Sequence, residues 1–409
     1  MGTDVQSGSV TTATQPAAPP RPQRWHSWPV LTWWLVLLAV ALAGWWLTGS
    51  ADPGAPAGRA AEQFWPYAAL PPILLITVLV ATARGWPESV RWRPLLLLAY
   101  AAAALWTLTL AATGGALWTT VVPDAETTPP LPGLLLDRLA GSGVDGSAAT
   151  VLVCLTGAAA TPLVALAVRS MCDESAARRL LPVLTLAPYA VVGANAEAIA
   201  LGLGAATLVV AAVASEAGRP APVRLAVALG CGVLLGGAAL FGFAAVLLAA
   251  GVVCVFFVRR RPLLNIATAA GFFLPIVLAR VAGYDWTEDL GDALRDADPS
   301  HGYAGGLFAA AVLLLVLSGP ALVASARSMR TTPAWPFLVA GGAAALAALL
   351  AGLITDRISP GSLLPALPWL LVAASAPAVQ GGPSRPVPAS VVAVGALTAY
   401  ALAVLARLT

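Results

Sequence analysis

Two acidic residues stand two positions apart in a polar segment of this chain, at a spacing that could do general-base chemistry. Asp124 and Glu126 lie within residues 113–147, and Pro129, Pro130 and Pro132 follow them. The prolines prevent a straight helix there. A carboxylate held at a membrane surface can take a proton from a hydroxyl group, such as that of a sugar. The alternative is a solvated loop whose acids only keep it out of the membrane.

Glu197 is a second candidate, because it lies in the segment GANAEAIA (193–200) between two apolar runs. An ionised side chain at mid-membrane costs about 2.5–3.5 kcal/mol, so such residues usually serve a function. In the alternative interpretation the segment is a tight outer turn, with Glu197 at the water surface and capping the next helix.

Residues 283–303 predict an amphipathic helix on the outer surface. Trp286, Leu290 and Leu294 recur every four residues and form one apolar stripe. Asp285 and five further acids occupy other positions. The acidic face could hold a divalent cation through oxygen ligands, or it could simply be solvated. The sequence has only two histidines, far apart, so we expect no zinc or haem site.

Four further charged residues are candidates for binding substrate. Arg280 and Arg357 lie near the outer ends of apolar runs, Asp356 precedes Arg357, and Arg138 lies in a predicted short helix at 131–139. An arginine there can bind a phosphate through two hydrogen bonds. Extension of the side chain toward lipid headgroups explains the same positions equally well.

The amino-acid composition indicates the type of fold that positions these residues. Of 409 residues, 59% are hydrophobic and 10% are charged, whereas a soluble domain has about 25% charged residues. This excludes an ordinary soluble enzyme, a disordered protein and a nucleic-acid-binding module. The fold class that remains is all-α, a polytopic bundle of transmembrane helices.

The apolar runs predict about thirteen spans. Residues 1–29 are polar and predict a disordered cytoplasmic tail, and residues 30–409 form one integral membrane domain with outer loops at 113–147 and 283–303. The first run is long and lacks a cleavage site, so we expect a retained span. The short run 180–194 is broken by Pro188, and glycines predict a hairpin within 225–258. The runs are 30–48, 65–83, 94–118, 148–168, 180–194, 197–214, 225–240, 241–258, 262–282, 304–325, 334–354, 362–379 and 388–406.

The arginines orient this layout. With the N-terminus in the cytoplasm and alternating spans, 16 of the 22 basic residues fall inside and 14 of the 19 acidic residues fall outside or near the outer ends of spans. The positive-inside rule predicts this asymmetry. We therefore expect a multi-pass protein of the cell membrane with a cytoplasmic N-terminus and an extracytoplasmic C-terminus. Twelve spans with both ends inside are the alternative.

Short motifs in a fixed order resemble those of a group of actinobacterial membrane proteins that look like GT-C glycosyltransferases. They are TPPLPGLLLDRL from Thr128, LAVRS from Leu166, SAARRLLPVLTLAPYAVV from Ser175 and GANAEA from Gly193. YDWTEDLGDALRD, LVLSGPALVA and LITDRISP follow in the same order, so the resemblance covers about 250 residues. The family's His-Pro-Pro-Gly motif has Thr128 in place of its histidine and Leu131 in place of its glycine.

The resemblance implies transfer of a sugar from a polyprenyl-phosphate donor to a lipid or glycan acceptor on the extracytoplasmic face. It places the catalytic base at Asp124 or Glu126, and Glu197 at the aspartate of the family's turn. The donor carries its own leaving group, so no nucleotide-binding fold is required and no cofactor is certain. Expected partners are the lipid-linked donor, the acceptor and membrane lipids, with no nucleic acid.

Two other classes of function stay open on the sequence. The missing histidine, replaced by Thr128, and the short acidic loop before Pro129 favour a non-catalytic cell-envelope scaffold. A transporter or lipid flippase would also have about this number of helices, but it should place ionisable residues midway along broken spans. Here the polar residues gather toward the outer surface instead.

Overall fold

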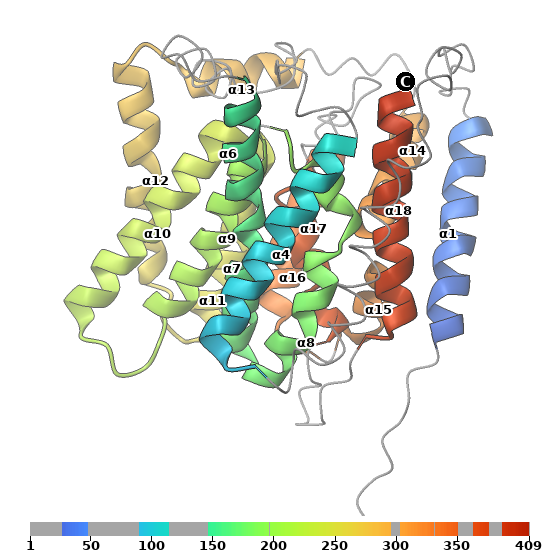
Figure 1. The fold of residues 1–409 in the computed structure, drawn as a ribbon. Coiled ribbons are helices and arrows are strands. Elements are labelled where there is room, and N and C mark those ends of the chain that lie inside the picture. The colour runs from blue at the N-terminus through green and yellow to red at the C-terminus, as the bar shows by residue number, and fades with distance from the viewer. Residues whose placement is uncertain are drawn as a thin grey trace, which may run out of the picture.

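The computed structural model describes residues 27–47, 90–113, 146–195, 197–295, 303–330, 332–350, 363–375 and 387–408. Within these ranges all regular structure is helical, and most helices run along one common direction (Figure 1). Many large apolar side chains are exposed, among them Leu97, Phe273 and Leu278. An apolar exterior around an apolar core suits a protein whose solvent is lipid. The expected fold class, an all-α membrane bundle, is confirmed.

The elements follow one another as α-helices with three short 3₁₀ segments. They are α1 (Ser27–Leu47), α4 (Trp92–Thr113), α6 (Gly146–Ala158), α7 (Ala160–Met171), α8 (Glu174–Thr185), η3 (Pro188–Val192), α9 (Glu197–Ala214), α10 (Ala221–Phe241), η4 (Phe243–Leu248), α11 (Ala249–Val258), α12 (Leu264–Val281), α13 (Trp286–Arg295), α14 (Tyr303–Ser318), α15 (Ala321–Ser328), α16 (Trp335–Leu350), α17 (Leu367–Leu370), η7 (Val372–Ala374) and α18 (Ala389–Leu408).

Within the described ranges, five helices are long and apolar enough to cross a membrane. They are α4, α9, α10, α12 and the nearly continuous α6–α7. The bent pair α14–α15 adds a sixth if it counts as one span. The predicted run 65–83 lies outside the described residues, so the expected total of about thirteen stays a prediction.

Prolines and glycines interrupt three of the predicted runs. The run 304–325 bends by 96° between α14 and α15, at Gly319 and Pro320. The run 362–379 was expected to be a span, but its described part, 363–375, holds only the four-residue α17 and the short η7. Pro365 and Pro368 explain this difference, because each removes an amide donor from the helical ladder. As predicted, Pro188 separates α8 from η3.

The predicted hairpin within 225–258 is present, but its turn comes after two of the three glycines that were expected to form it. Gly236 and Gly237 lie inside α10, and only Gly242 lies at the break. Gly232 and Gly236 instead face α12, where an added Cβ would lie 1.9 Å from Thr268 O and 2.3 Å from Phe272 O. The glycines therefore serve close helix packing, a role that the small-residue spacing allows.

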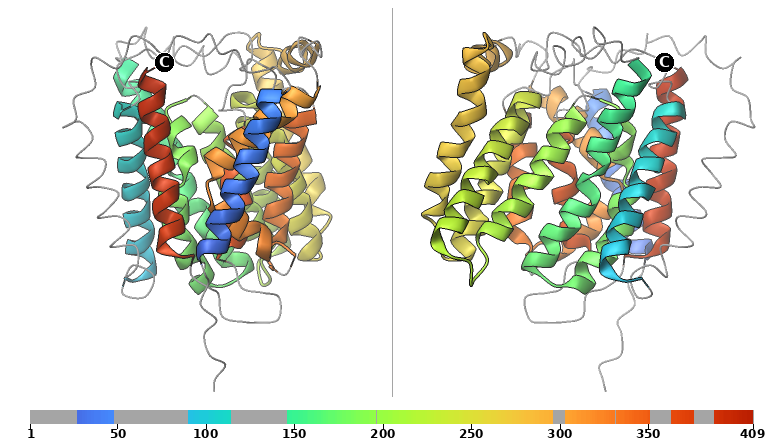
Figure 2. Two further views of the ribbon diagram at one scale, coloured as in Figure 1. Left: turned by 90° about the vertical axis from the view of Figure 1, so that its right-hand side faces the viewer. Right: turned by 60° about the vertical axis from the view of Figure 1, so that its left-hand side comes forward.

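The two ends of the described chain lie at opposite ends of the bundle. In Figure 1, α1 begins at the lower end and α18 finishes at the upper end, where the surface helix α13 also lies; Figure 2 shows the same arrangement from two other sides. Two hydrogen bonds join helix ends at the lower end of the bundle. Arg178 donates to Val90 O, just before α4, and Arg259 donates to Ser170 O near the end of α7.

The charges of the described residues follow this division. The end that carries the start of α1, here called the arginine-rich end, holds 12 arginines and three acids. This matches the predicted segregation, and the assignment of that end to the cytoplasm stays a prediction. The arginines are Arg91, Arg93, Arg169, Arg178, Arg179, Arg219, Arg224, Arg259, Arg260, Arg261, Arg327 and Arg330, and the acids are Asp173, Glu174 and Glu216.

Candidate functional site

Glu197 is the most deeply buried charged residue among the described ones, with 2% of its surface exposed. It is the first residue of α9, after the turn that follows η3. Pro188 begins η3 and Gly193 ends it, so the chain turns sharply between α8 and α9. An acidic residue in a first turn also interacts favourably with the helix dipole.

The turn before Glu197 packs near the end of the bundle opposite the arginine-rich end, which is called the outer end below, and it is away from the protein surface. Ala194 contacts Ala111 and Cys154, and Ala111 is two residues before the end of α4. Gly193 lies against Thr107, where an added Cβ would be 2.6 Å from Thr107 Cγ2. The interpretation that placed Glu197 at the water surface is therefore wrong, because α4 and α6 cover this turn.

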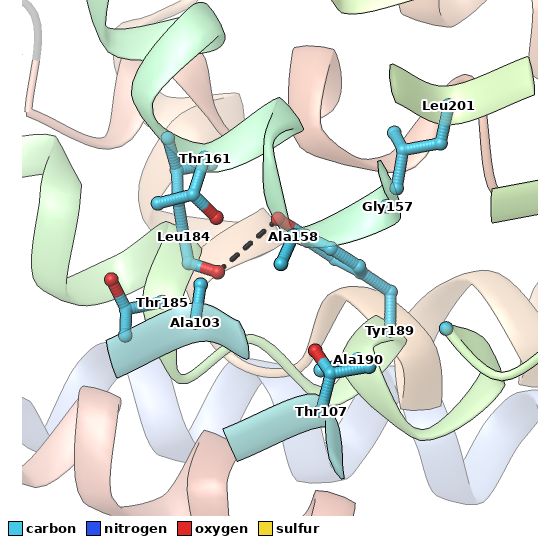
Figure 3. Close-up of a pocket in the computed structure, with 11 residues that line it drawn as sticks. Ala103, Thr107, Gly157, Ala158, Thr161, Leu184, Thr185, Tyr189, Ala190 and Leu201 are labelled. Atoms are coloured by element: carbon cyan, nitrogen blue, oxygen red, sulfur yellow. Dashed lines mark hydrogen bonds between the residues drawn. The ribbon is translucent and has the colours of Figure 1, made fainter. Parts of the chain in front are cut away.

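A small cavity lies next to this turn (Figure 3). Its volume is about 10 Å³, room for about one water molecule. Leu201, one helical turn after Glu197 in α9, forms part of the wall, so the cavity is on the same side of α9 as the glutamate. A sugar does not fit in this space.

Four hydroxyl groups give the cavity its polar character. They belong to Thr107 in α4, Thr161 in α7, Thr185 in α8 and Tyr189 in η3. The Tyr189 hydroxyl donates a hydrogen bond to Leu184 O at 3.2 Å, the carbonyl that the end of α8 leaves available. The hydroxyl oxygen of Thr185 is buried and has no hydrogen-bond partner within the described residues. One water in the cavity would satisfy it.

Sequence reasoning missed this hydroxyl cluster. Threonines within apolar spans usually bond to their own helix, as Thr156 and Thr207 do here. Their occurrence alone therefore carries no signal. The usable signal was Pro188 followed by Tyr189, since a proline that ends a helix leaves carbonyls for a nearby hydroxyl.

A second polar group lies at the outer end of α12. Arg280 Nη2 is 3.4 Å from Asp285 Oδ2, and 72% of the arginine side chain is exposed. Asp285 Oδ1 accepts hydrogen bonds from the amides of Thr287 and Glu288, which stabilises the start of α13. The hydrogen bond from the Thr287 hydroxyl, the two amides and the Arg280 charge hold the pKa of Asp285 below its ordinary value.

The surface helix α13 confirms the predicted amphipathic helix. It lies across the outer end of α12 (Figure 1). Trp286 Nε1 donates to Ala239 O of α10 at 2.9 Å, and Leu290 packs against the same apolar cluster. Glu288 is exposed. Within the described ranges no group of three or more acidic, histidine or cysteine side chains could hold a metal ion.

The described site residues do not gather around one cavity. Helix α10 packs against α9 on one side and α12 on the other (Figure 1). Glu197 and the Arg280–Asp285 pair are therefore separated by α10, and none of the three lines the cavity. The remaining candidates lie outside the described residues: Asp124, Glu126, Arg138, Asp356 and Arg357.

Comparisons with known proteins gave one solved structure. No family model matches the chain, and no curated protein matches it. The structure is that of ArnT from Cupriavidus metallidurans in the apo state, a GT-C glycosyltransferase, with 15% sequence identity and a TM-score of 0.42. The match covers 92% of this chain and 76% of ArnT.

Proposed function

We propose that this protein is a GT-C-like membrane glycosyltransferase. It would transfer a sugar from a polyprenyl-phosphate donor to a lipid or glycan acceptor of the cell envelope, on the extracytoplasmic side. The ordered motifs between Thr128 and Pro360 suggest this class. The structural observation that carries the proposal is the buried carboxylate of Glu197 at the outer end of the bundle.

A buried carboxylate in a lipid-embedded bundle is expensive, and close packing alone does not require one. Apolar side chains of similar size would fill the start of α9 at lower cost. Glu197 takes the place of the aspartate in the family's turn, and we expect it to bind substrate. The adjacent cavity has room for about one water molecule, so a donor sugar would reach this carboxylate only after the turn before α9 moves. The negative charge would then accept hydrogen bonds from sugar hydroxyls and orient the donor.

The chemistry requires two further groups. Asp124 or Glu126 would serve as the base that removes the proton of the acceptor hydroxyl. Arginines at the outer surface, among Arg138, Arg280 and Arg357, would stabilise the negative charge on the departing phosphate. Among these, only Arg280 lies within the described residues; its side chain is 72% exposed and 3.4 Å from Asp285 Oδ2, and α10 separates it from Glu197.

The direct test replaces each carboxylate by its amide in membranes that contain the full chain. We expect Asp124→Asn or Glu126→Gln to reduce consumption of lipid-linked sugar by 100-fold or more, a loss on the order of that for a general base. Glu197→Gln should mainly weaken donor binding and raise KM.

Glu216→Gln is the matched control for these variants, because Glu216 is at the arginine-rich end and pairs with Arg219. Its turnover should equal that of the wild type. If the amide variants at 124, 126 and 197 all turn over at the wild-type rate, these carboxylates do not form the site. If the wild type itself consumes no lipid-linked sugar, the scaffold alternative gains support.

A transporter is the second candidate, and one observation favours it. The two broken helices meet in the bundle, because a Cβ on Gly319, at the α14–α15 break, would be 2.9 Å from Pro188 at the start of η3. Transporters bind substrates at such junctions. In the described residues the junction holds Ser318 but no charged side chain. Proteoliposomes that take up substrate or scramble lipid without consuming sugar would favour this function.

A further inference from the structure

Three consecutive arginines form the turn between α11 and α12, at the arginine-rich end of the bundle. The amide of Arg261 donates to Phe256 O at 2.8 Å, and the amide of Arg260 donates to Phe257 O at 2.9 Å. This pair of bonds closes the C-terminus of α11 and requires a left-handed residue at the turn. Arg260 occupies that position, with a φ of 56°.

Glycine is the usual residue at such a position, because a Cβ is disfavoured there. Arg260 is the one non-glycine residue with a positive φ within the described ranges. Backbone geometry therefore does not explain the arginine, and its guanidinium group is the feature to account for.

One of the three arginines forms a hydrogen bond to another helix, and the other two are at least partly exposed. Arg259 Nη2 donates to Ser170 O at 2.5 Å and thereby joins the end of α11 to the end of α7. Arg260 is exposed and Arg261 half-buried. Neither Arg260 nor Arg261 has a carboxylate within ion-pair distance among the described residues.

Three other arginines at this end are paired with carboxylates. Arg219 pairs with Glu216 at 2.9 Å. Glu174 pairs with Arg169 at 2.8 Å and with Arg178 at 2.7 Å. Several further arginines at this end also lack a carboxylate within ion-pair distance among the described residues, and the α11–α12 turn differs from them in presenting two such arginines in succession beside exposed apolar side chains.

A fourth arginine lies at the same level. Thr268 Oγ1 of α12 donates to Ala228 O of α10 at 3.0 Å, and these two helices run in parallel. Four residues earlier on each helix, Arg224 of α10 therefore lies level with Leu264, three residues after Arg261. Arg224, Arg260 and Arg261 together are called the outward arginine cluster below.

Exposed apolar side chains flank this cluster. Phe257 is 60% exposed, Leu263 is 75% exposed and Ile266 is 69% exposed. Large apolar side chains on the outside of a membrane bundle contact acyl chains. The cluster therefore lies where acyl chains give way to headgroups, with its guanidinium groups at the level of lipid phosphates.

We propose that the outward arginine cluster binds the phosphate of an anionic phospholipid, whose acyl chains lie against Phe257, Leu263 and Ile266. Guanidinium groups bind phosphate through paired hydrogen bonds, and their attraction to anionic lipid is large near the membrane surface. The occupant is a lipid rather than a soluble anion because the apolar side chains beside the charges fit acyl chains. The site is separate from the proposed transferase site at the other end of the bundle.

The test uses the full-length protein in detergent with equal amounts of phosphatidylglycerol and phosphatidylcholine, and counts retained lipid by native mass spectrometry. The wild type should retain phosphatidylglycerol preferentially. Arg260→Gly combined with Arg261→Gln should reduce that retention by about fivefold for each arginine removed. Glycine suits the left-handed position, so this variant should fold at least as well as the wild type.

Arg219→Gln is the matched control, because it removes a neutralised arginine at the same end. Its retention of phosphatidylglycerol should stay at the wild-type level. Equal retention of the two lipids by the wild type would overturn the proposal, as would unchanged retention by the Arg260→Gly/Arg261→Gln variant. Displacement of the lipid by millimolar inorganic phosphate would also overturn it, because the site would then be one for a soluble anion.

Discussion

Helices α9 and α12 have the same length and similar hydropathy but opposite surroundings. Each has 18 residues, with a mean hydropathy of 2.0 for α9 and 1.7 for α12. In α9, 67% of the residues are buried inside the protein, whereas in α12 only 17% are. Hydropathy thus identifies a membrane span but does not say whether its neighbours are helices or lipids.

The side-chain sizes of the two helices explain the difference. Alanine and glycine fill most of the buried positions of α9, such as Ala198, Gly202 and Ala205. These residues let several helices approach closely. Helix α12 has one narrow stripe of this kind, at Thr268 and Gly271, and it packs there against α10. Its other faces carry large residues that suit lipid.

The largest expected effect disrupts the main packing contact of α12, which is with α10. A Cβ at residue 232 would lie 1.9 Å from Thr268 O, so Gly232→Ala must push α10 and α12 apart. We expect a loss of about 3 kcal/mol or more in stability, measured as a lower temperature of unfolding in detergent. Gly230→Ala is the control in the same helix, since nothing lies within 4 Å of its added Cβ. Equal unfolding temperatures for the two variants would refute the close contact.

A smaller effect compares the core with the lipid-facing surface. Ala205 of α9 is 0% exposed, so Ala205→Leu should overpack the core and cost about 1–3 kcal/mol. Leu274 of α12 is 48% exposed, so Leu274→Ala should change stability by less than about 0.5 kcal/mol. Both variants would be measured by unfolding in detergent. The contrast between the helices fails if Leu274→Ala destabilises the protein as much as Ala205→Leu does.

The smallest effect concerns the outer end of α12 and depends on pH. Because the folded-state pKa of Asp285 is lowered, its carboxylate stabilises the start of α13 above its ordinary pKa of 3.8. That contribution is lost as the pH falls through the lowered pKa. Amide hydrogen exchange of α13 should therefore accelerate only at pH values below about 4, relative to α9.

Asp285→Asn is the comparison for this pH dependence. The nearby charged groups are Arg280, Glu288 and Asp289. The asparagine variant should exchange faster than the wild type at neutral pH and should lose most of the further change on acidification. An identical pH profile in the two proteins would show that the Asp285 carboxylate is not the source of the effect.

Much of the helical layout was predictable from the sequence. The run 197–214 coincides with α9, and the predicted 30–48 and 262–282 differ from α1 and α12 by three residues or fewer at each end. The stripe of Trp286 and Leu290 predicted α13. These elements depend on hydropathy and helical periodicity, which are local properties of the chain.

The packing of the candidate site was less accessible to sequence reasoning. The sequence indicated that Glu197 was unusual, but its two interpretations differed in depth, and the covering of the turn by α4 and α6 decided between them. The hydroxyl cluster around Tyr189 joins four elements, and the spacing of single threonines does not reveal it. The separation of Glu197 from Arg280 also depends on α10 packing between their helices.

The sequence by itself determined that this protein is a membrane bundle of helices and which end of it collects the arginines, because the transfer of each segment into lipid depends on its own residues. The tertiary structure decided which spans lie in the core and which face lipid, and that the run 304–325 bends at Gly319 and Pro320. The polarity of a span does not indicate whether it faces lipid or another helix, because lipid tails are as apolar as leucine. Whether a span lies in the core or faces lipid depends on close packing at glycines and alanines, and these contacts form only when the helices assemble.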